Sequence, residues 1–276
     1  MIPPAFDYVA PDSLDEAIQA LAEGGDDAKL LAGGHSLIPL MKMRYAAPEL
    51  LVDLRKLDEL RGVQPTDAGF RIGALTTHAQ LSQSAELGVV AEAAGKIADQ
   101  QVRNRGTIGG SLAHGDSASD LPAVVLAMDG SVVAQGPNGE REIPAAELFQ
   151  DFLTTSLADD EVVTAVKLPE MGDWGFAYEK FTRRAEDWAM VGVCAMVKSD
   201  FSDVRVALTN MGGTPIRATA VEEALRGQQR DGGVIAVAAE QADQGTDPPS
   251  DLNATADYKR HLARVLTRRA LEKAAG

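Results

Sequence analysis

Residues 30–37 of the chain read Leu-Leu-Ala-Gly-Gly-His-Ser-Leu, and residues 107–112 read Thr-Ile-Gly-Gly-Ser-Leu. Each segment places a glycine pair directly after an apolar stretch, with a serine close behind the pair. Glycine has no Cβ and permits positive φ, so that consecutive backbone N–H groups can converge on an anion. A pyrophosphate needs such a concave set of short donors, and each hydrogen bond to a charged group contributes about 1.5–3 kcal/mol.

Neither glycine segment is specific when it is taken alone, because Gly-Gly is also common in plain turns. Neither segment matches G-x-G-x-x-G, and the sequence contains no Gly-Lys-Ser or Gly-Lys-Thr of a P-loop. A Rossmann domain and a P-loop nucleoside triphosphatase are therefore disfavoured.

Composition narrows the class of protein further. The chain has 276 residues, of which 45% are hydrophobic and 24% charged, as expected for a soluble globular protein. At about 150 residues per domain, one large or two modest domains are expected. Lys plus Arg is 26 and Asp plus Glu is 41, so that 26 − 41 = −15. Such an acidic chain disfavours a nucleic-acid partner.

Metal and disulfide chemistry have little support in the sequence. Cys194 is the single cysteine, which excludes an internal disulfide, an iron–sulfur cluster and a thiolate zinc site. We expect Cys194 to be a buried small apolar residue. His114 and Asp116 lie close together, but four histidines without clustered carboxylates predict no metal site.

The sequence also gives an expectation for the cellular compartment of the protein. We see no basic stretch followed by an apolar run at the N-terminus, and nowhere do 18 uncharged apolar residues follow one another. We therefore expect a cytoplasmic protein, and association with the inner face of the membrane is compatible with this expectation.

Periodicity predicts an alternation of helices and strands. The pattern of predicted elements changes around residues 170–176. Before this point helices are expected over 12–23, 37–43, 89–98 and 120–128, and strands over 29–32, 50–54, 70–74, 131–134 and 161–166. After it, long strands are expected over 175–181, 189–198 and 204–211, and helices over 218–226, 233–242 and from 255 onwards.

Further stretches surround the two glycine segments in a fixed order. They include Ile72-Gly73-Ala74-Leu75-Thr76-Thr77-His78, Ser119-Asp120-Leu121-Pro122 and Tyr178-Glu179-Lys180-Phe181. Through these stretches and the two glycine segments, the chain resembles the FAD-binding medium subunit of molybdenum-containing hydroxylases. The resemblance covers essentially the whole chain. This family includes the aerobic carbon monoxide dehydrogenases and the flavin module of the xanthine dehydrogenases.

The resemblance implies an α+β fold in two parts. Residues 1–172 would form a PCMH-type FAD-binding domain with two lobes, 1–56 and 57–172. Residues 173–276 would form a C-terminal flavoprotein domain, built from a three-stranded antiparallel sheet with helices.

The resemblance also implies a site for FAD. The first segment would wrap the pyrophosphate, the second would hold it from the other side, Asp120 would bond to ribityl hydroxyls, and Lys180 would approach the isoalloxazine edge. The implied cofactor-binding residues are Leu30, Leu31, Ala32, Gly33, Gly34, His35, Ser36, Leu37, Thr107, Ile108, Gly109, Gly110, Ser111, Asp120 and Lys180.

Several of these assignments have alternatives. Asp120 could instead cap the following helix, and Lys180 could be an ordinary surface residue of a strand. Ser111 stands where the family usually has asparagine, so that the local flavin geometry would change. His35 could donate to the flavin, face solvent or attach FAD covalently. Either Val162 or Val163 would line the pocket.

Other residues have structural interpretations. We expect His78 to be structural and lean towards a bracing role for Arg103 and Arg105 over a contact with a partner. Tyr178 and Trp188 could pack on the flavin or in the core.

The implied function is an electron-transfer subunit that binds one FAD noncovalently. A large subunit would carry the molybdenum cofactor and oxidise the substrate, and a small subunit would carry two [2Fe–2S] clusters, in a dimer of heterotrimers. Electrons would pass through this chain's FAD to an external acceptor such as a quinone, O₂ or NAD⁺. Carbon monoxide is favoured as the substrate of the complex over an N-heterocycle or an aldehyde, and no catalytic residue is expected in this chain.

Two other classes compete with this interpretation. One is a stand-alone flavin reductase of the same fold, like the enolpyruvyl reductase of peptidoglycan synthesis. The other is an assembly protein that has lost the cofactor, which two intact glycine segments argue against.

Overall fold

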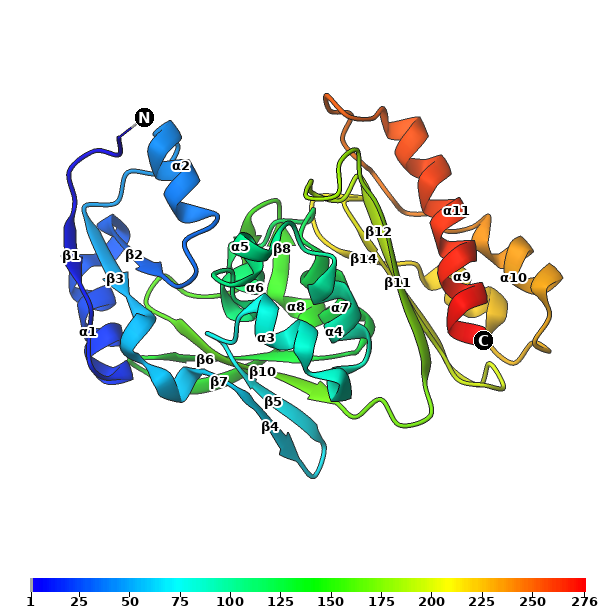
Figure 1. The fold of residues 1–276 in the computed structure, drawn as a ribbon, viewed down its shortest axis with the longest axis horizontal. Helices are drawn as coiled ribbons and strands as arrows, with labels where there is room; N and C mark the ends of the chain where they lie inside the picture. The colour runs from blue at the N-terminus through cyan, green and yellow to red at the C-terminus, as the bar shows by residue number, and fades with distance from the viewer. Residues whose placement is uncertain (1) are drawn as a thin grey trace.

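The computed structural model describes residues 2–276 and arranges them around three main β-sheets (Figure 1). The sheets follow one another along the chain, from a small parallel sheet at the blue N-terminal end to an antiparallel sheet beside the red C-terminal helix. The fold is thus α+β and continues in a C-terminal antiparallel sheet with helices, as the sequence predicts.

The N-terminal sheet has the strand order β1-β3-β2, and both pairings are parallel. Ser13 caps its first helix by accepting a hydrogen bond from the Glu16 N–H. Elements of this part are β1 (Asp7–Val9), α1 (Leu14–Gly24), η1 (Gly25–Asp27), β2 (Ala28–Leu31), α2 (Leu37–Met43), β3 (Leu50–Asp53), η2 (Leu54–Lys56) and η3 (Asp58–Leu60).

The central sheet has five antiparallel strands in the order β4-β5-β10-β6-β7, and short helices pack against it. The strands are β4 (Val63–Thr66), β5 (Gly69–Gly73), β6 (Ser131–Gly136), β7 (Gly139–Pro144) and β10 (Val162–Pro169), with a hairpin of β8 (Phe149–Asp151) and β9 (Thr154–Thr155) beside them. The helices are α3 (His78–Gln83), η4 (Ala85–Leu87), α4 (Val89–Gly95), α5 (Gln100–Arg103), α6 (Ile108–His114), α7 (Asp120–Ala127) and α8 (Ala145–Leu148).

The C-terminal sheet contains the three long strands expected from the sequence and a fourth strand of two residues that periodicity did not predict. A strand of two residues is too short to show an alternating pattern. The elements are β11 (Gly175–Phe181), β12 (Val191–Val197), β13 (Val204–Thr209), β14 (Ile216–Arg217), α9 (Thr219–Leu225), α10 (Gly232–Ala239) and α11 (Ala256–Ala275). Within residues 2–276, no helix combines the length and the apolar character needed to cross a bilayer.

Both faces of the C-terminal sheet are covered. Helix α11 packs on its outer face, and α4 and α7 pack on its inner face (Figure 1). Successive side chains of a strand point to opposite faces, so that Val193 joins the core under α11 while Cys194 joins the core that contains α7. Cys194 is fully buried, as predicted, and burial raises the pKa of its thiol.

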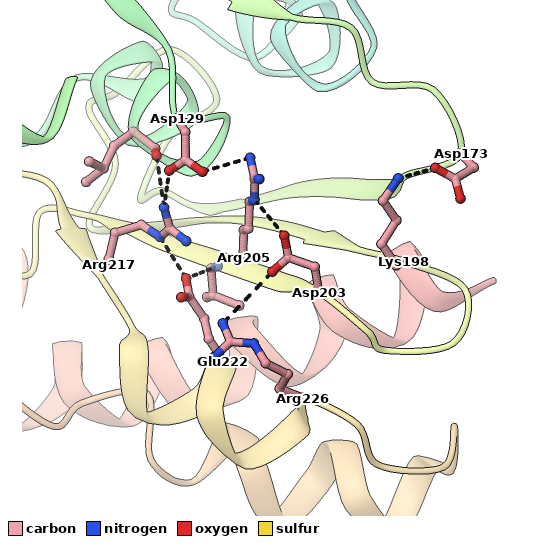
Figure 2. A network of polar contacts seen from close by, with 10 residues as sticks. Asp129, Asp173, Lys198, Asp203, Arg205, Arg217, Glu222 and Arg226 are labelled. Atoms are coloured by element: carbon pink, nitrogen blue, oxygen red, sulfur yellow. Dashed lines mark hydrogen bonds and ion pairs between the residues drawn. The ribbon is translucent and has the colours of Figure 1, made fainter. Parts of the chain in front are cut away.

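Helix α7 is buried along its whole length, and the C-terminal sheet holds its far end through ion pairs (Figure 2). Arg217 lies 2.7 Å from Asp129 and 2.7 Å from Glu222, and Arg205 lies 2.9 Å from Asp129. Guanidinium groups at the C-terminal end of a helix also suit its dipole. The position of α7 is therefore tied to the C-terminal sheet.

Candidate functional site

A cleft of about 710 Å³ lies between the N-terminal sheet and the helices of the central sheet, which is within the usual range for a small-molecule site. Residues 30–37 and most of 107–111 line it, together with Asp120 and Lys180. The structure therefore brings together two segments that lie far apart in the sequence. Ile108 is the exception among the predicted site residues, because its side chain is fully buried in the central core and does not line the cleft.

At Gly33 the first glycine segment touches the two residues that directly precede the second segment. A Cβ on Gly33 would collide with the carbonyl oxygen of Arg105 and would lie 2.8 Å from the Cα of Gly106. Gly34, the next residue, has a φ of 76°, a region that L side chains rarely adopt. The first glycine pair is thus required by a close contact and by a turn.

The backbone of the first segment offers free donors. Within residues 2–276, the N–H groups of residues 33–37 donate no hydrogen bond to a protein atom, and the helical pattern of α2 begins only with Ile38 donating to the Gly34 carbonyl. Ser36 makes no side-chain cap bond to α2. A run of unpartnered N–H groups at the wall of a cleft is the donor set that suits an anionic group.

The second segment differs from the first in its backbone hydrogen bonds, and the expectation that its N–H groups are free to bind an anion is wrong. It forms the start of helix α6, and Thr107 is the N-cap. The N–H groups of residues 108–111 already donate to Thr76, Ala74 and Thr107, so that they are not available to grip a ligand. What this segment offers to the cleft is the side chain of Ser111, for which no hydrogen bond is found within residues 2–276.

Asp120 and Lys180 form a buried ion pair at the cleft. Lys180 Nζ donates to Asp120 Oδ2 at 2.9 Å, and the Tyr178 hydroxyl donates to Asp120 Oδ1 at 2.6 Å. The two charged side chains are only 6% and 5% exposed. Burial raises the pKa of Asp120, while Lys180 and Tyr178 act in the opposite direction.

These contacts decide between the alternatives that the sequence left open. Asp120 is the first residue of α7, Ser119 is the N-cap, and no side-chain cap bond is present there, so the capping interpretation of Asp120 is wrong. The interpretation of Lys180 as an exposed strand residue is wrong too. Tyr178 belongs to the core, where burial raises the pKa of its hydroxyl.

Lys96 and Glu92 also support this pair, and sequence reasoning missed both. Lys180 Nζ donates to the Lys96 carbonyl at 3.2 Å, and Lys96 Nζ donates to the Tyr178 carbonyl. Glu92 lies 3.2 Å from Lys96 and also contacts Lys273 of α11. Lys96 and Lys180 lie far apart in the sequence and on different elements, so no local pattern could have indicated the contact.

The structure also shows which of the remaining candidate residues line the cleft. Val163 lines it, whereas Val162 is fully buried in the N-terminal core. Trp188 lines the cleft and is 57% exposed. Arg103 donates to the carbonyl oxygens of residues 97 and 98 at 2.7 Å, which confirms its bracing role.

Two histidines line the cleft. His35 is exposed, and its Nδ1 lies 3.3 Å from the Gly33 carbonyl oxygen. His78 is 5% exposed, and burial lowers its pKa to about 4, with the charges of His35 and Arg103 acting in the same direction. Among residues 2–276, no group of three His, Cys, Asp or Glu side chains is placed to hold a metal ion.

Comparisons with known proteins identify the family of the chain. Residues 4–171 match the family described as FAD binding domain in molybdopterin dehydrogenase, and residues 176–274 match the CO dehydrogenase flavoprotein C-terminal domain. The chain belongs to this family, the FAD-binding medium subunits of the molybdenum hydroxylases, and is an oxidoreductase subunit.

Individual relatives extend over the whole chain. The carbon monoxide dehydrogenase medium chain of Hydrogenophaga pseudoflava is 43% identical and covers 99% of this chain and 98% of its own length. A subunit of the 6-hydroxypseudooxynicotine dehydrogenase complex of Paenarthrobacter nicotinovorans is 41% identical, covering 99% and 96%. The solved structure of the Hydrogenophaga pseudoflava carbon monoxide dehydrogenase that lacks the Mo-pyranopterin moiety matches with a TM-score of 0.96 and 44% identity, covering 99% and 98%.

Proposed function

We propose that this chain holds one FAD noncovalently in the cleft and passes electrons through it. The observation that carries the proposal is the run of unpartnered N–H groups at residues 33–37, which faces a cleft of about 710 Å³. A dinucleotide needs both a donor set for its pyrophosphate and apolar surface for its rings, and this cleft has such N–H groups and apolar lining residues such as Leu37, Leu54 and Val163. The proposed FAD contacts are residues 30–37, Thr107, Gly109, Gly110, Ser111, Asp120 and Lys180.

Each wall of the cleft has a separate task in this proposal. The N–H groups of residues 33–37 and the Ser36 hydroxyl bind the pyrophosphate. Ser111 adds a hydroxyl donor from the opposite wall, where its short side chain reaches less far than the asparagine usual in the family. Val163 contributes apolar surface. Close packing of Gly33 on Gly106 fixes the distance between the walls.

Lys180 and Asp120 tune the flavin end of the cleft. When bound, FAD supplies the redox chemistry, while the protein positions it and sets its electrostatic surroundings. Two of the three Lys180 N–H donors are used, by Asp120 and by the Lys96 carbonyl. The third remains for an acceptor in the cleft, and the Asp120 carboxylate offsets the charge of the ammonium group.

We propose that this chain belongs to a molybdenum hydroxylase complex. A large subunit of the complex would carry the molybdenum cofactor, and a small subunit would carry two [2Fe–2S] clusters. This chain, with one cysteine, has no ligand set for such clusters. The complex is proposed to be a cytoplasmic dimer of heterotrimers that passes its electrons to an external acceptor. Within this chain, we propose that residues 1–172 form the FAD-binding domain and residues 173–276 the C-terminal flavoprotein domain.

Carbon monoxide is the proposed substrate of the complex. Its support is the 43% identity to a carbon monoxide dehydrogenase medium chain, against 41% for a subunit of the 6-hydroxypseudooxynicotine dehydrogenase complex. An N-heterocycle or aldehyde hydroxylase is the alternative, because the substrate is oxidised on a partner subunit.

The test is to express the chain alone, remove bound flavin and titrate it with FAD while recording visible absorption and flavin fluorescence. Saturable binding of one FAD per chain is expected, and no binding would overturn the proposal. Expression with the neighbouring genes should yield a complex with an iron–sulfur chain and a molybdenum chain. Reductase activity of the isolated chain on its own organic substrate would instead support a stand-alone enzyme.

A further inference from the structure

His78 occupies an unusual place for a histidine with no established role in the site. It is the first residue of α3, and Thr77 before it closes a capping box with Gln80. Its side chain is 5% exposed, yet it forms part of the cleft wall. The residue therefore lies at the boundary between the core and the proposed FAD site.

The imidazole ring packs directly on the second glycine segment. A Cβ on Gly106 would lie 2.7 Å from Cδ2 of His78, and a Cβ on Gly33 would lie 2.8 Å from the Cα of Gly106. Gly106 is thus in close contact with both Gly33 and His78. The imidazole therefore lies against the same residue that Gly33 contacts.

Backbone hydrogen bonds fix His78 in place. The His78 N–H donates to the Gly106 carbonyl at 3.0 Å, and the Ile108 N–H donates to the Thr76 carbonyl at 3.1 Å. Thr77 and Thr107 accordingly form an antiparallel bridge. These bonds join the start of α3 to the second segment, so that the size of the His78 side chain bears directly on Gly106.

Packing of the ring, and not a hydrogen bond from Nδ1, connects the His78 side chain to Gly106. Nδ1 is buried and has no hydrogen-bond partner within residues 2–276. The ring edge that faces Gly106 consists of Cδ2 and Nε2, so His78 meets this glycine through packing.

We propose that His78 is a positioning residue that presses Gly106 against Gly33 and thereby sets the spacing of the two glycine segments around the FAD pyrophosphate. The inference rests on the proposed FAD site. It assigns the spacing to a side chain that does not itself need to touch the phosphates, and it makes ring shape, not hydrogen bonding, the selected property.

The experiment compares the FAD affinity of the full-length chain, measured by fluorescence titration of the flavin-free protein, for wild type, His78→Ala and His78→Phe. His78→Ala should weaken binding by about tenfold or more, and His78→Phe should restore it to within about threefold of wild type. Equal affinity of His78→Ala and wild type would overturn the proposal. Equal weakening in both variants would also overturn it, because the nitrogens would then be responsible.

Two further measurements keep the outcome clear. His261→Ala removes an imidazole on α11 that stacks on Tyr258 outside the cleft, and it should bind FAD like wild type. If His78→Ala does not fold, His78→Leu replaces it, and wild-type affinity in that variant would contradict the role of a flat ring. Failure of wild type itself to bind FAD would overturn the proposed function, and is thereby distinguished from failure of the His78 proposal.

Discussion

Lys180 Nζ lies 2.9 Å from Asp120 Oδ2, and this contact joins strand β11 to the first residue of helix α7. Both groups are nearly removed from solvent, and Tyr178 donates a second hydrogen bond to the same carboxylate. Breaking a buried pair on one side leaves an uncompensated charge, which costs more than the pair itself contributes. The contact therefore matters for stability as well as for the cleft.

Replacing Lys180 by methionine should lower the free energy of unfolding by about 3–5 kcal/mol, because Asp120 would remain buried without its cation. Guanidinium denaturation of the flavin-free chain at neutral pH measures the change. Lys167→Met is the matched control, since Lys167 pairs with Glu142 at the surface, where a salt bridge contributes about 0–1 kcal/mol.

The double variant Lys180→Met with Asp120→Asn should recover part of the loss, because the isolated carboxylate is gone. A Lys180→Met protein as stable as the Lys167→Met control would show that Asp120 is not held as a buried ion.

Lys180 should also affect the reduction potential of bound FAD. The ammonium group favours negative charge in the cleft, so that Lys180→Gln should lower the potential by about 30 mV or more, equivalent to a tenfold shift for a two-electron couple. Lys180→Arg, which keeps the charge, should lie closer to wild type. Spectroscopic titration against redox dyes measures this, and an unchanged potential in Lys180→Gln would place the lysine away from the flavin.

Much of the fold was accessible from the sequence because hydrophobic periodicity is local. The strand predicted over residues 175–181 agrees with β11, and the helix predicted over 37–43 agrees with α2. Strand β12 also shows why a continuous apolar run is informative, because all seven of its residues are buried between two layers. The predicted helix over 89–98 extends too far, since α4 ends at Gly95.

Most residues that line the cleft were predictable from the sequence, but the hydrogen bonds among them were not. The glycine pairs indicated where the backbone approaches another group closely, but they did not show whether that group is a ligand or another part of the chain. At Gly33 the neighbour is the backbone of Arg105 and Gly106, so a larger residue would separate the two segments before it met any phosphate. Which N–H groups are already used, as at residues 108–111, depends on partners distant in the sequence. The same holds for the contact between Lys96 and Lys180.

Arg217 should contribute to stability from the other end of α7. It pairs with Asp129 and with Glu222, whose side chain is 5% exposed (Figure 2). Arg217→Ala should lower the free energy of unfolding by about 3–5 kcal/mol, because the buried Glu222 loses its cation. Arg226→Ala is the control, since Arg226 is 50% exposed and 3.9 Å from Asp203, and should cost less than about 1 kcal/mol. Similar losses in the two variants would contradict a special role for Arg217.

His78 gives the chain a stability that depends on pH. Its pKa in the folded chain is about 4, against about 6.5 when exposed, because burial disfavours the charged ring and His35 and Arg103 add to the effect. Between these values the unfolded chain binds more protons than the folded chain, so stability is full above about pH 6.5 and falls as the pH drops towards 4. The loss amounts to about 3 kcal/mol at the lower limit.

Chemical denaturation of the flavin-free chain at several pH values between 7.5 and 4.5 measures this dependence. His78→Phe should reduce the slope of unfolding free energy against pH by about one proton, since phenylalanine does not titrate. His261→Phe should leave the slope unchanged, because His261 lies on the exposed side of α11. If His78→Phe and wild type lose stability in parallel across this range, the folded chain must hold a protonated His78, and the buried neutral ring described above would be wrong.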